Sequence, residues 1–186
     1  MDNGAESYRR FLSGDEDGLV ALVRDYKDGL MLFLNRYTND LAVAEELTED
    51  VFFRLAVKKP RFREDAAFQT WLYAIGRNEA LTCLRRRGRV DGAPVEERED
   101  LSDEAANLER EYLREERKIA IHRALGRLKP DYAAALYLRY FEDMTPEQAA
   151  KVLKKTKRQF ANLSYQAKLA LKRELEKEGI TEEGLS

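Results

Sequence analysis

Apolar residues recur along this chain at intervals of three and four residues, which is the spacing of one face of an α-helix. The pattern predicts helices over residues 17–36, 40–58, 64–87, 103–128, 131–142, 145–153 and 156–178. No run of useful length alternates apolar and polar residues, and Gly and Pro stand mainly between the periodic segments. We therefore predict an all-α fold.

The segment RVDGAPVEERED, residues 89–100, interrupts this periodicity with glycine, proline and a cluster of acidic residues. It follows a run of basic residues and has little apolar surface to bury. We predict a flexible acidic linker over residues 89–112. It joins a small helical domain over residues 1–88 to a second one over residues 113–186.

Charge is unevenly distributed along the chain, although the net charge is only −2. Residues 61–90 carry seven Arg against three acidic residues, and residues 91–117 carry four Arg against eleven Asp and Glu. Residues 118–186 return to fourteen basic against nine acidic residues. Two basic blocks around an acidic segment are typical of a protein with two phosphate-facing surfaces. Solvated helix faces would explain any one block, but they explain the alternation less well.

Composition also limits the location and the chemistry. No apolar run approaches the roughly 18 residues of a membrane helix, and the first residues lack the pattern of a secretory signal. Cys83 is the only cysteine, so an internal disulfide is impossible and a reducing compartment fits. We expect a cytoplasmic protein that is not inserted in a membrane.

No residue pattern of an enzyme is recognisable. The single histidine, His122, falls on an apolar helix, where a structural role is expected rather than a catalytic one. Metal-ligand spacings of Cys and His, phosphate-binding loops and nucleophile motifs are missing from the sequence. We expect no catalytic site, no cofactor, no bound metal and no small-molecule substrate.

Two short segments in the C-terminal half carry the residues of helix capping boxes. TPEQ, residues 145–148, offers a hydroxyl as N-cap, a proline at the first helical position and a glutamine that reaches back. TKRQ, residues 156–159, repeats this arrangement eleven residues later. A short helix, a tight basic turn and a second capped helix together predict a helix-turn-helix.

The second helix of this motif has two distinct faces. A stripe predicted to pack inward contains Phe160, Leu163, Ser164, Ala167, Leu171 and Leu175. The opposite side of its first two turns carries Arg158, Ala161, Asn162 and Tyr165. Base edges are read by the first turns of a recognition helix, where Arg and Asn bind guanine and adenine, while lysines hold phosphates. The candidate DNA contacts are Lys154, Lys155, Lys157, Arg158, Gln159, Asn162, Tyr165 and Lys168. A plain helical hairpin with solvated lysines is the alternative.

The predicted helix over residues 40–58 combines an apolar stripe with an acidic face. The stripe contains Leu41, Ala44, Leu47, Val51 and Leu55. The opposite face carries Glu46, Glu49 and Asp50, with Phe53 among them. A phenylalanine within an acidic face suggests contact with a basic partner that has an apolar patch. Packing of Phe53 on a neighbouring helix of its own domain is the alternative.

Residues 61–87 interleave aromatic residues with arginines. Rings on which bases stack, and guanidinium groups that follow phosphates, suit single-stranded nucleic acid. Phe68, Trp71, Leu72 and Ile75 share one face and are expected in the core in any case. The candidate contacts of this segment are Arg61, Phe62, Gln69, Thr70, Arg77, Asn78 and Arg85.

At these residues the chain resembles a known family. The segments AEELTEDVFFRLAVKKPRF, FQTWLYAIGRNEALTCLRRR and ALGRLKPDYAAALYLRYFEDMTPEQAAKVLKK are similar to regions 2 and 4 of extracytoplasmic-function sigma factors of bacterial RNA polymerase. The similarity extends from about Tyr8 to Glu178 and excludes the linker. Several motifs in the same order are more specific than a lone helix-turn-helix.

The resemblance implies a protein that binds core RNA polymerase and directs it to promoters. The acidic helix face with Phe53 then docks on the clamp of the largest polymerase subunit. Residues 61–87 melt the −10 element and capture its non-template bases, and the helix-turn-helix reads the −35 element. An anti-sigma factor is an expected partner by resemblance only.

The chain departs from the family at a few positions. Ala161 and Leu163 stand where members commonly carry Lys or Arg, so the base sequence read at −35 stays open. Thr82 stands where many members have Asp. The competing interpretation is a helix-turn-helix transcriptional regulator without sigma activity, which leaves the aromatic and arginine-rich segment 61–87 unexplained.

Overall fold

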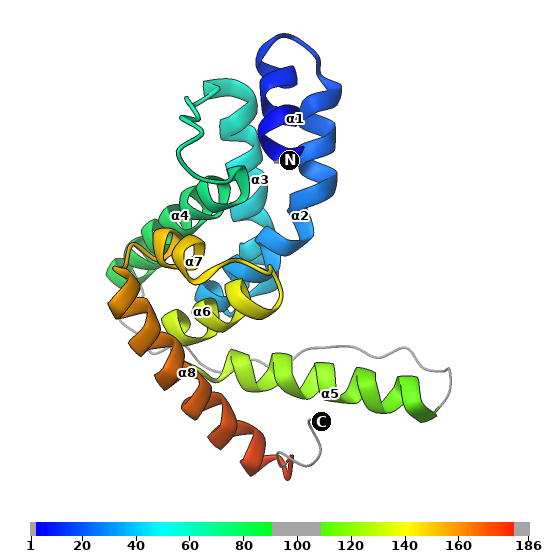
Figure 1. Cartoon of the computed structure of the whole chain (residues 1–186), viewed down its shortest axis with the longest axis vertical. Helices are drawn as coiled ribbons and strands as arrows, with labels where there is room; N and C mark the ends of the chain where they lie inside the picture. Colours follow the sequence, from blue (N-terminus) through cyan, green and yellow to red (C-terminus); the bar gives the residue numbers. More distant parts are fainter. Residues whose placement is uncertain (1–2, 91–108, 181–186) are drawn as a thin grey trace.

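The computed structural model describes residues 3–90 and 109–180, and these residues fold into helices joined by turns (Figure 1). The helices are α1 (Asn3–Leu12), α2 (Asp17–Thr38), α3 (Leu41–Lys58), α4 (Phe68–Val90), α5 (Glu109–Gly126), α6 (Pro130–Tyr140), α7 (Pro146–Val152) and α8 (Lys157–Lys177). Strands are missing from this described part, and the predicted all-α fold is confirmed.

The helices differ from the predicted ones by a few residues at several ends and more clearly in α1 and α4. α1 was not predicted from periodicity. α4 begins at Phe68 instead of residue 64, because Glu64 has a φ of 57°, which a right-handed helix excludes. The start of the helix predicted over residues 103–128, and most of the predicted linker, lie outside the described residues.

Helices α1 to α4 form an N-terminal lobe around α2. Leu22, Leu30, Phe33 and Leu34 of α2 are fully buried against its neighbours. α4 crosses α2 closely at Gly76, where a Cβ atom would lie only 2.9 Å from a methyl carbon of Leu30. A larger residue at this crossing would push the buried Leu30 side chain aside.

An aromatic cluster fixes the far end of this lobe. Tyr8 of α1 packs against Phe68 and Trp71, with ring centroids 5.5 Å away in both cases. Its hydroxyl donates a hydrogen bond to the carbonyl oxygen of Pro60 at 2.7 Å, and burial raises the pKa of Tyr8 to about 12. This bond ties α1 to the segment that leads into α4.

Helices α5 to α8 form a C-terminal lobe with a small core of its own. Leu125 of α5, Leu136 of α6 and Ala167 of α8 are buried together. Most of the other buried residues of α6 and α7 instead join the core of the N-terminal lobe, among them Ala134, Tyr137, Ala149 and Val152.

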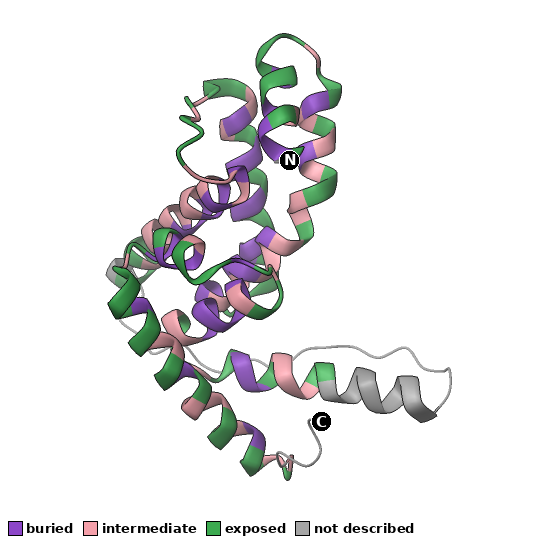
Figure 2. Ribbon diagram, viewed as in Figure 1, coloured by how far each residue is buried: buried purple, intermediate pink, exposed green. Residues whose placement is uncertain are grey.

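The two lobes are therefore packed on each other. α6 lies against α2, and α7 lies against α4. Figure 2 shows buried segments of α2, α4, α6 and α7 facing one another where the lobes meet. The two domains expected from the sequence share one continuous hydrophobic core in this structure.

Candidate nucleic-acid interface

The helix-turn-helix consists of α7, a four-residue turn and α8. The Thr145 hydroxyl accepts a hydrogen bond from the Gln148 amide at 3.2 Å, and the Gln148 side chain accepts one from the Thr145 amide at 2.8 Å. Thr156 and Gln159 repeat this reciprocal pair at 3.2 and 2.9 Å. Both predicted capping boxes are confirmed. They fix where each helix begins and hence the angle at which α8 leaves the turn.

The turn itself requires an unusual backbone conformation. Lys154 has a φ of 54°, in the left-handed region, and its amide hydrogen bonds to the carbonyl oxygen of Lys151. The chain reverses within a few residues because of this conformation. The exposed side chain of Lys154 is placed at the corner of the motif.

The inward stripe predicted for α8 is confirmed. Phe160, Ala167 and Leu175 are buried, and the remaining members of the stripe are half-buried. On the opposite face Arg158, Ala161, Asn162 and Tyr165 are exposed. Tyr165 keeps 61% of its surface accessible although it is aromatic. The face predicted to read bases is therefore open to a partner.

The candidate phosphate contacts of this motif differ in their surroundings. Lys157 pairs with Glu147 at 2.5 Å, an exposed pair that raises the pKa of Lys157 and lowers that of Glu147. Lys155 is half-buried and lies 3.4 Å from Asp131. The ammonium group of Lys168 lies over the ring of Tyr140 at 5.6 Å. Gln159 is exposed, but its side-chain oxygen serves the cap of α8.

The acidic face of α3 is exposed as expected. Asp40 caps the helix by accepting hydrogen bonds from the amides of Ala42 and Val43. The side chains of Glu46, Glu49 and Asp50 point to solvent. Phe53 keeps 67% of its surface accessible, so the alternative that it packs within its own domain is wrong.

The apolar stripe of α3 is confirmed except at one position. Ala44, Leu47, Val51 and Leu55 are buried, whereas Leu41 is 49% exposed. Leu41 is the first helical residue after the cap, at the end of the stripe.

The candidate residues of segment 61–87 fall into two groups, and the first lies at the surface. Arg61 and Arg85 are exposed, and the Arg85 guanidinium donates a hydrogen bond to the Leu81 carbonyl oxygen. Phe62 is half-buried, with its ring 5.2 Å from Trp71 and 5.5 Å from Phe68. Phe62 therefore belongs in part to the aromatic cluster.

The second group is at least partly buried, and two of its members contact the C-terminal lobe. Thr70 is 2% exposed, and Arg77 is 9% exposed. Gln69 donates a hydrogen bond to Glu142 at 2.7 Å. The Arg77 guanidinium donates one to the Tyr37 hydroxyl at 3.2 Å and lies 3.8 Å from Asp131 of α6. Sequence reasoning did not identify Asp131 and Glu142, because no local pattern marks a contact between segments so distant along the chain.

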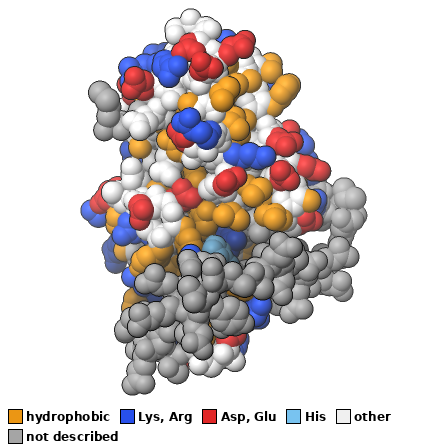
Figure 3. All heavy atoms as spheres, turned by 90° about the vertical axis from the view of Figure 1, so that its right-hand side faces the viewer, with side chains coloured by type: hydrophobic (Ala, Val, Ile, Leu, Met, Phe, Trp, Pro, Cys, Tyr) orange, Lys and Arg blue, Asp and Glu red, His pale blue; other side chains and the backbone are white. Residues whose placement is uncertain are grey.

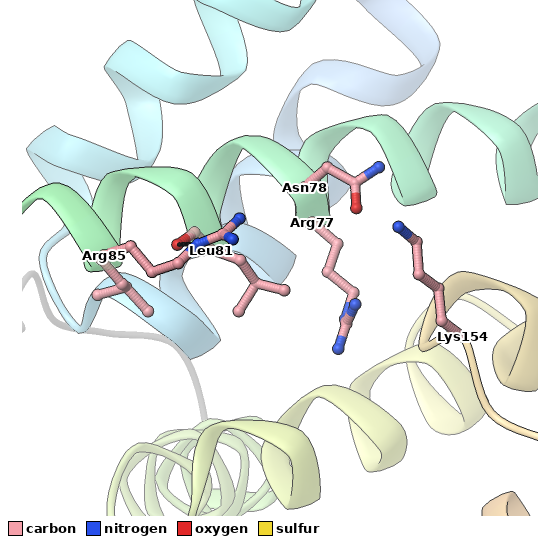
Figure 4. Close-up of a pocket in the computed structure, with 6 residues that line it drawn as sticks. Arg77, Asn78, Leu81, Arg85 and Lys154 are labelled. Atoms are coloured by element: carbon pink, nitrogen blue, oxygen red, sulfur yellow. Dashed lines mark hydrogen bonds between the residues drawn. The ribbon is translucent and has the colours of Figure 1, made fainter.

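A basic cavity marks the boundary between the lobes (Figure 4). It has a volume of about 560 Å³, and its lining consists of Arg77, Asn78, Leu81, Leu84, Arg85 and Lys154. Lys154 reaches toward α4 from the turn before α8, and Arg77 extends from α4 toward the C-terminal lobe. Candidate contacts from both halves of the sequence therefore line one space.

The histidine has a structural environment. Its ring centroid lies 4.9 Å from that of Phe141, and burial together with the nearby charge of Arg36 lowers the pKa of His122. Figure 3 shows it next to both hydrophobic and basic side chains. Within residues 3–90 and 109–180, no group of three or more His, Cys, Asp or Glu side chains is arranged to hold a metal ion. None of the helices there is long and apolar enough to cross a membrane.

Comparison with known sequences places both halves of the chain. Residues 22–90 match the family described as Sigma-70 region 2, and residues 118–171 match Sigma-70, region 4. The RNA polymerase sigma-H factor of Pseudomonas aeruginosa is 30% identical over 152 residues, which cover 77% of this chain and 79% of the relative. The ECF RNA polymerase sigma-E factor of Escherichia coli is 28% identical over the same shares of the two chains. The chain belongs to the extracytoplasmic-function sigma factors.

A solved structure shows the same fold. The sigma factor RpoE of Bartonella quintana, in complex with the anti-sigma factor NepR, has a TM-score of 0.67 and 22% sequence identity. The match covers 83% of this chain and 94% of that one. As the family matches of both halves show, this sigma factor binds core RNA polymerase and directs promoter-specific initiation. A helix-turn-helix regulator without sigma activity is not favoured, because region 2 accounts for the residues that this alternative leaves unexplained.

Proposed function

We propose that three surfaces divide the work of this sigma factor, and that the acidic face of α3 docks on the clamp of the largest polymerase subunit. An exposed phenylalanine among Glu46, Glu49 and Asp50 offers apolar contact inside a ring of negative charge. Charge guides the approach of a basic partner, and a buried aromatic side chain supplies most of the affinity.

The segment over residues 61–87 melts the −10 element and holds its non-template strand. Its exposed arginines are placed to follow phosphates, and Gln69, Thr70 and Asn78 supply the polar groups for base edges. Single-stranded bases expose these edges fully, which suits capture after melting. Gln69 and Arg77 are released from their partners Glu142 and Asp131 only when the C-terminal lobe moves away from α4.

The N-terminal turns of α8 read the −35 element in the major groove. The single observation that supports this best is the exposed face of Arg158 and Asn162, held on a helix whose start is fixed by a complete capping box. Both side chains can make bidentate contacts to a base. Lys155 and Lys168 hold phosphates and fix the register.

A −35 base-substitution series tests this division in the full polymerase complex. Asn162→Ala or Arg158→Ala should cost about 1–3 kcal/mol and relax the preference at one base position. Lys155→Ala is the matched control. Losing a phosphate contact should weaken binding to all promoter sequences alike and should lower the slope of log affinity against log salt concentration by about one unit. An unchanged base-preference profile for Asn162→Ala would move the reading face to another side of α8.

We further propose that this sigma factor acts in the cytoplasm, catalyses no reaction itself and is held inactive by an anti-sigma factor. The similar structure of RpoE with NepR supports the last point by analogy. Co-purification of the full chain with a candidate anti-sigma protein, followed by loss of polymerase binding, is the test.

A further inference from the structure

The carboxylate of Glu142, in the C-terminal lobe, packs against two helices of the N-terminal lobe. Glu142, in the loop between α6 and α7, accepts a hydrogen bond from the Gln69 amide of α4 at 2.7 Å. Its other carboxylate oxygen lies over α2 at Gly29, where a Cβ atom would be only 2.5 Å away. The same Cβ atom would lie 2.6 Å from the Tyr73 hydroxyl. The carboxylate thus fills a space that exists because residue 29 is glycine.

The surroundings of Glu142 come from three helices. Tyr73 of α4 lies beside the carboxylate, although its hydroxyl makes no hydrogen bond of ordinary geometry within the described residues. Tyr137 of α6 donates a hydrogen bond to the carbonyl oxygen of Gly29 at 3.3 Å. Burial raises the pKa of Glu142, with a smaller increase from Asp143, while the polar contacts act in the opposite direction. The site is therefore polar, closed to solvent in part, and shared by both lobes.

Further contacts hold the lobes together around this point. Lys151 of α7 donates a hydrogen bond to the carbonyl oxygen of Asp65 at 3.2 Å. Asp131 of α6 lies between Arg77 and Lys155, at 3.8 and 3.4 Å. Arg77 and Lys155 are also proposed DNA contacts. The lobe interface and promoter binding therefore compete for the same side chains.

The closed arrangement conceals one functional surface and leaves two open. Thr70 and Arg77 are buried, and Gln69 is bonded to Glu142. The base-reading face of α8 and the Phe53 face of α3 stay exposed. The surfaces for polymerase docking and for −35 reading are therefore accessible in this form. The strand-capturing side chains of Thr70 and Arg77 are not.

DNA geometry leads to the same conclusion. The −10 and −35 elements lie about 25 base pairs apart, which is about 85 Å at about 3.4 Å per base pair. α4, with 23 residues, is only about 35 Å long, and α7 packs directly against it. Two lobes in this contact cannot reach both elements at once. On a promoter the lobes must have separated.

We propose that Glu142 is a latch that holds the free sigma factor in a closed form, in which region 4 occupies the strand-capturing side chains Gln69 and Arg77 of region 2. This inference rests on the proposed function of segment 61–87. Opening then follows docking on the polymerase, because the docking face is accessible while the latch is closed. Only open molecules bind single-stranded promoter DNA. The apparent affinity of the free protein is therefore its intrinsic affinity multiplied by the fraction of molecules that are open.

Two measurements on the full chain test the latch. Fluorescent labels on cysteines introduced at Ser13 and Lys177, with Cys83→Ser, report the distance between the lobes by energy transfer. A labelled single-stranded 20-mer of mixed sequence reports access to the strand-capturing side chains. Glu142→Ala should lower the closed-to-open ratio and raise affinity for this 20-mer by about tenfold, the effect of losing one charged hydrogen bond at a partly buried site.

Gly29→Ala should disrupt the same contact from the side of α2, in the N-terminal lobe. The added methyl group collides with the carboxylate and with the Tyr73 hydroxyl, whereas alanine by itself favours α2. Opening without loss of helical content is expected. Glu142→Gln keeps an acceptor for Gln69 and should stay closed. Asp143→Asn is the matched control in the same loop, since Asp143 is exposed and asparagine tolerates its φ of 50°.

The outcomes separate the latch from the proposed function. Longer label distances together with tighter binding of the 20-mer, in Glu142→Ala and Gly29→Ala but not in Asp143→Asn, support the latch. Unchanged distances in both variants would overturn it. Longer distances without any gain in affinity would show that region 4 does not mask the strand-capturing side chains. Failure of the proposed function is visible elsewhere, as absence of transcription with core polymerase for the wild type and the open variants alike.

Discussion

Replacing Phe53 by alanine tests the docking surface most sharply, because this side chain contributes little to the fold. Phe53 is 67% exposed on α3, so its removal leaves no cavity in the core. Substitutions at such exposed positions usually change the free energy of unfolding by about 0.5 kcal/mol or less. Any loss of polymerase affinity can then be attributed to the contact itself.

The size of that loss can be worked out from the exposed area. An aromatic side chain buries about 150–250 Å², of which 67% exposure leaves about 100–170 Å² to be covered by a partner. At about 25 cal/mol per Å² this corresponds to about 2.5–4 kcal/mol, an upper bound before ordering costs. We expect a loss of about 2 kcal/mol, or about 30-fold in the dissociation constant.

Fluorescence anisotropy of labelled sigma factor titrated with core polymerase, without DNA, is the assay. Val20→Ala is the matched control, since Val20 is 62% exposed on α2 and outside the acidic face. Phe52→Ala, next to Phe53 but only 8% exposed, should instead destabilise the fold by about 3–5 kcal/mol. Equal affinities for Phe53→Ala, Val20→Ala and the wild type would place the docking surface elsewhere.

Three further predictions concern the caps, the −10 segment and the latch. Thr156→Ala removes the N-cap of α8 and should lower the free energy of unfolding by about 1 kcal/mol in urea titrations; no change would mean that packing alone fixes the start of α8. Asn78→Ala should reduce open-complex formation on duplex promoters more than initiation from a pre-melted bubble, and a defect on neither template would remove Asn78 from the strand-capturing set. Because burial raises the pKa of Glu142, protonation adds stability to the closed form; this added stability should be fully present below the ordinary pKa of 4.5 and be lost as pH rises through the raised value. Label distances should therefore shorten as the pH falls toward 4.5, and a shift of the same size in Glu142→Gln would assign the effect to another group.

Local sequence patterns predicted the elements whose cause is local. The capping boxes at Thr145 and Thr156 need residues only three positions apart, and both are formed as expected. The same holds for the inward stripe of α8 and for the acidic face of α3, since helical periodicity assigns each side chain to one face. The exposure of Phe53 required the structure, because spacing alone did not say whether a neighbouring helix covers it.

Contacts between distant segments could not be predicted in this way. The partners of Glu142 lie far earlier in the chain, at Gly29 in α2 and at Gln69 in α4. Arg77 looked like a surface arginine in sequence, yet it is buried between Tyr37 and Asp131. Such pairings depend on how two lobes pack, which periodicity within one helix does not determine. The family resemblance indicated candidate functional surfaces but not this closed arrangement.

The most direct test of the central claim is transcription reconstituted from core RNA polymerase, this chain and a library of promoter fragments, with sequencing of the transcripts. If the chain is a promoter-specific sigma factor, transcripts should depend on its addition and begin downstream of shared −35 and −10 sequences. A transcript population identical to that of core polymerase alone, from a chain that still binds the polymerase, would contradict the assignment.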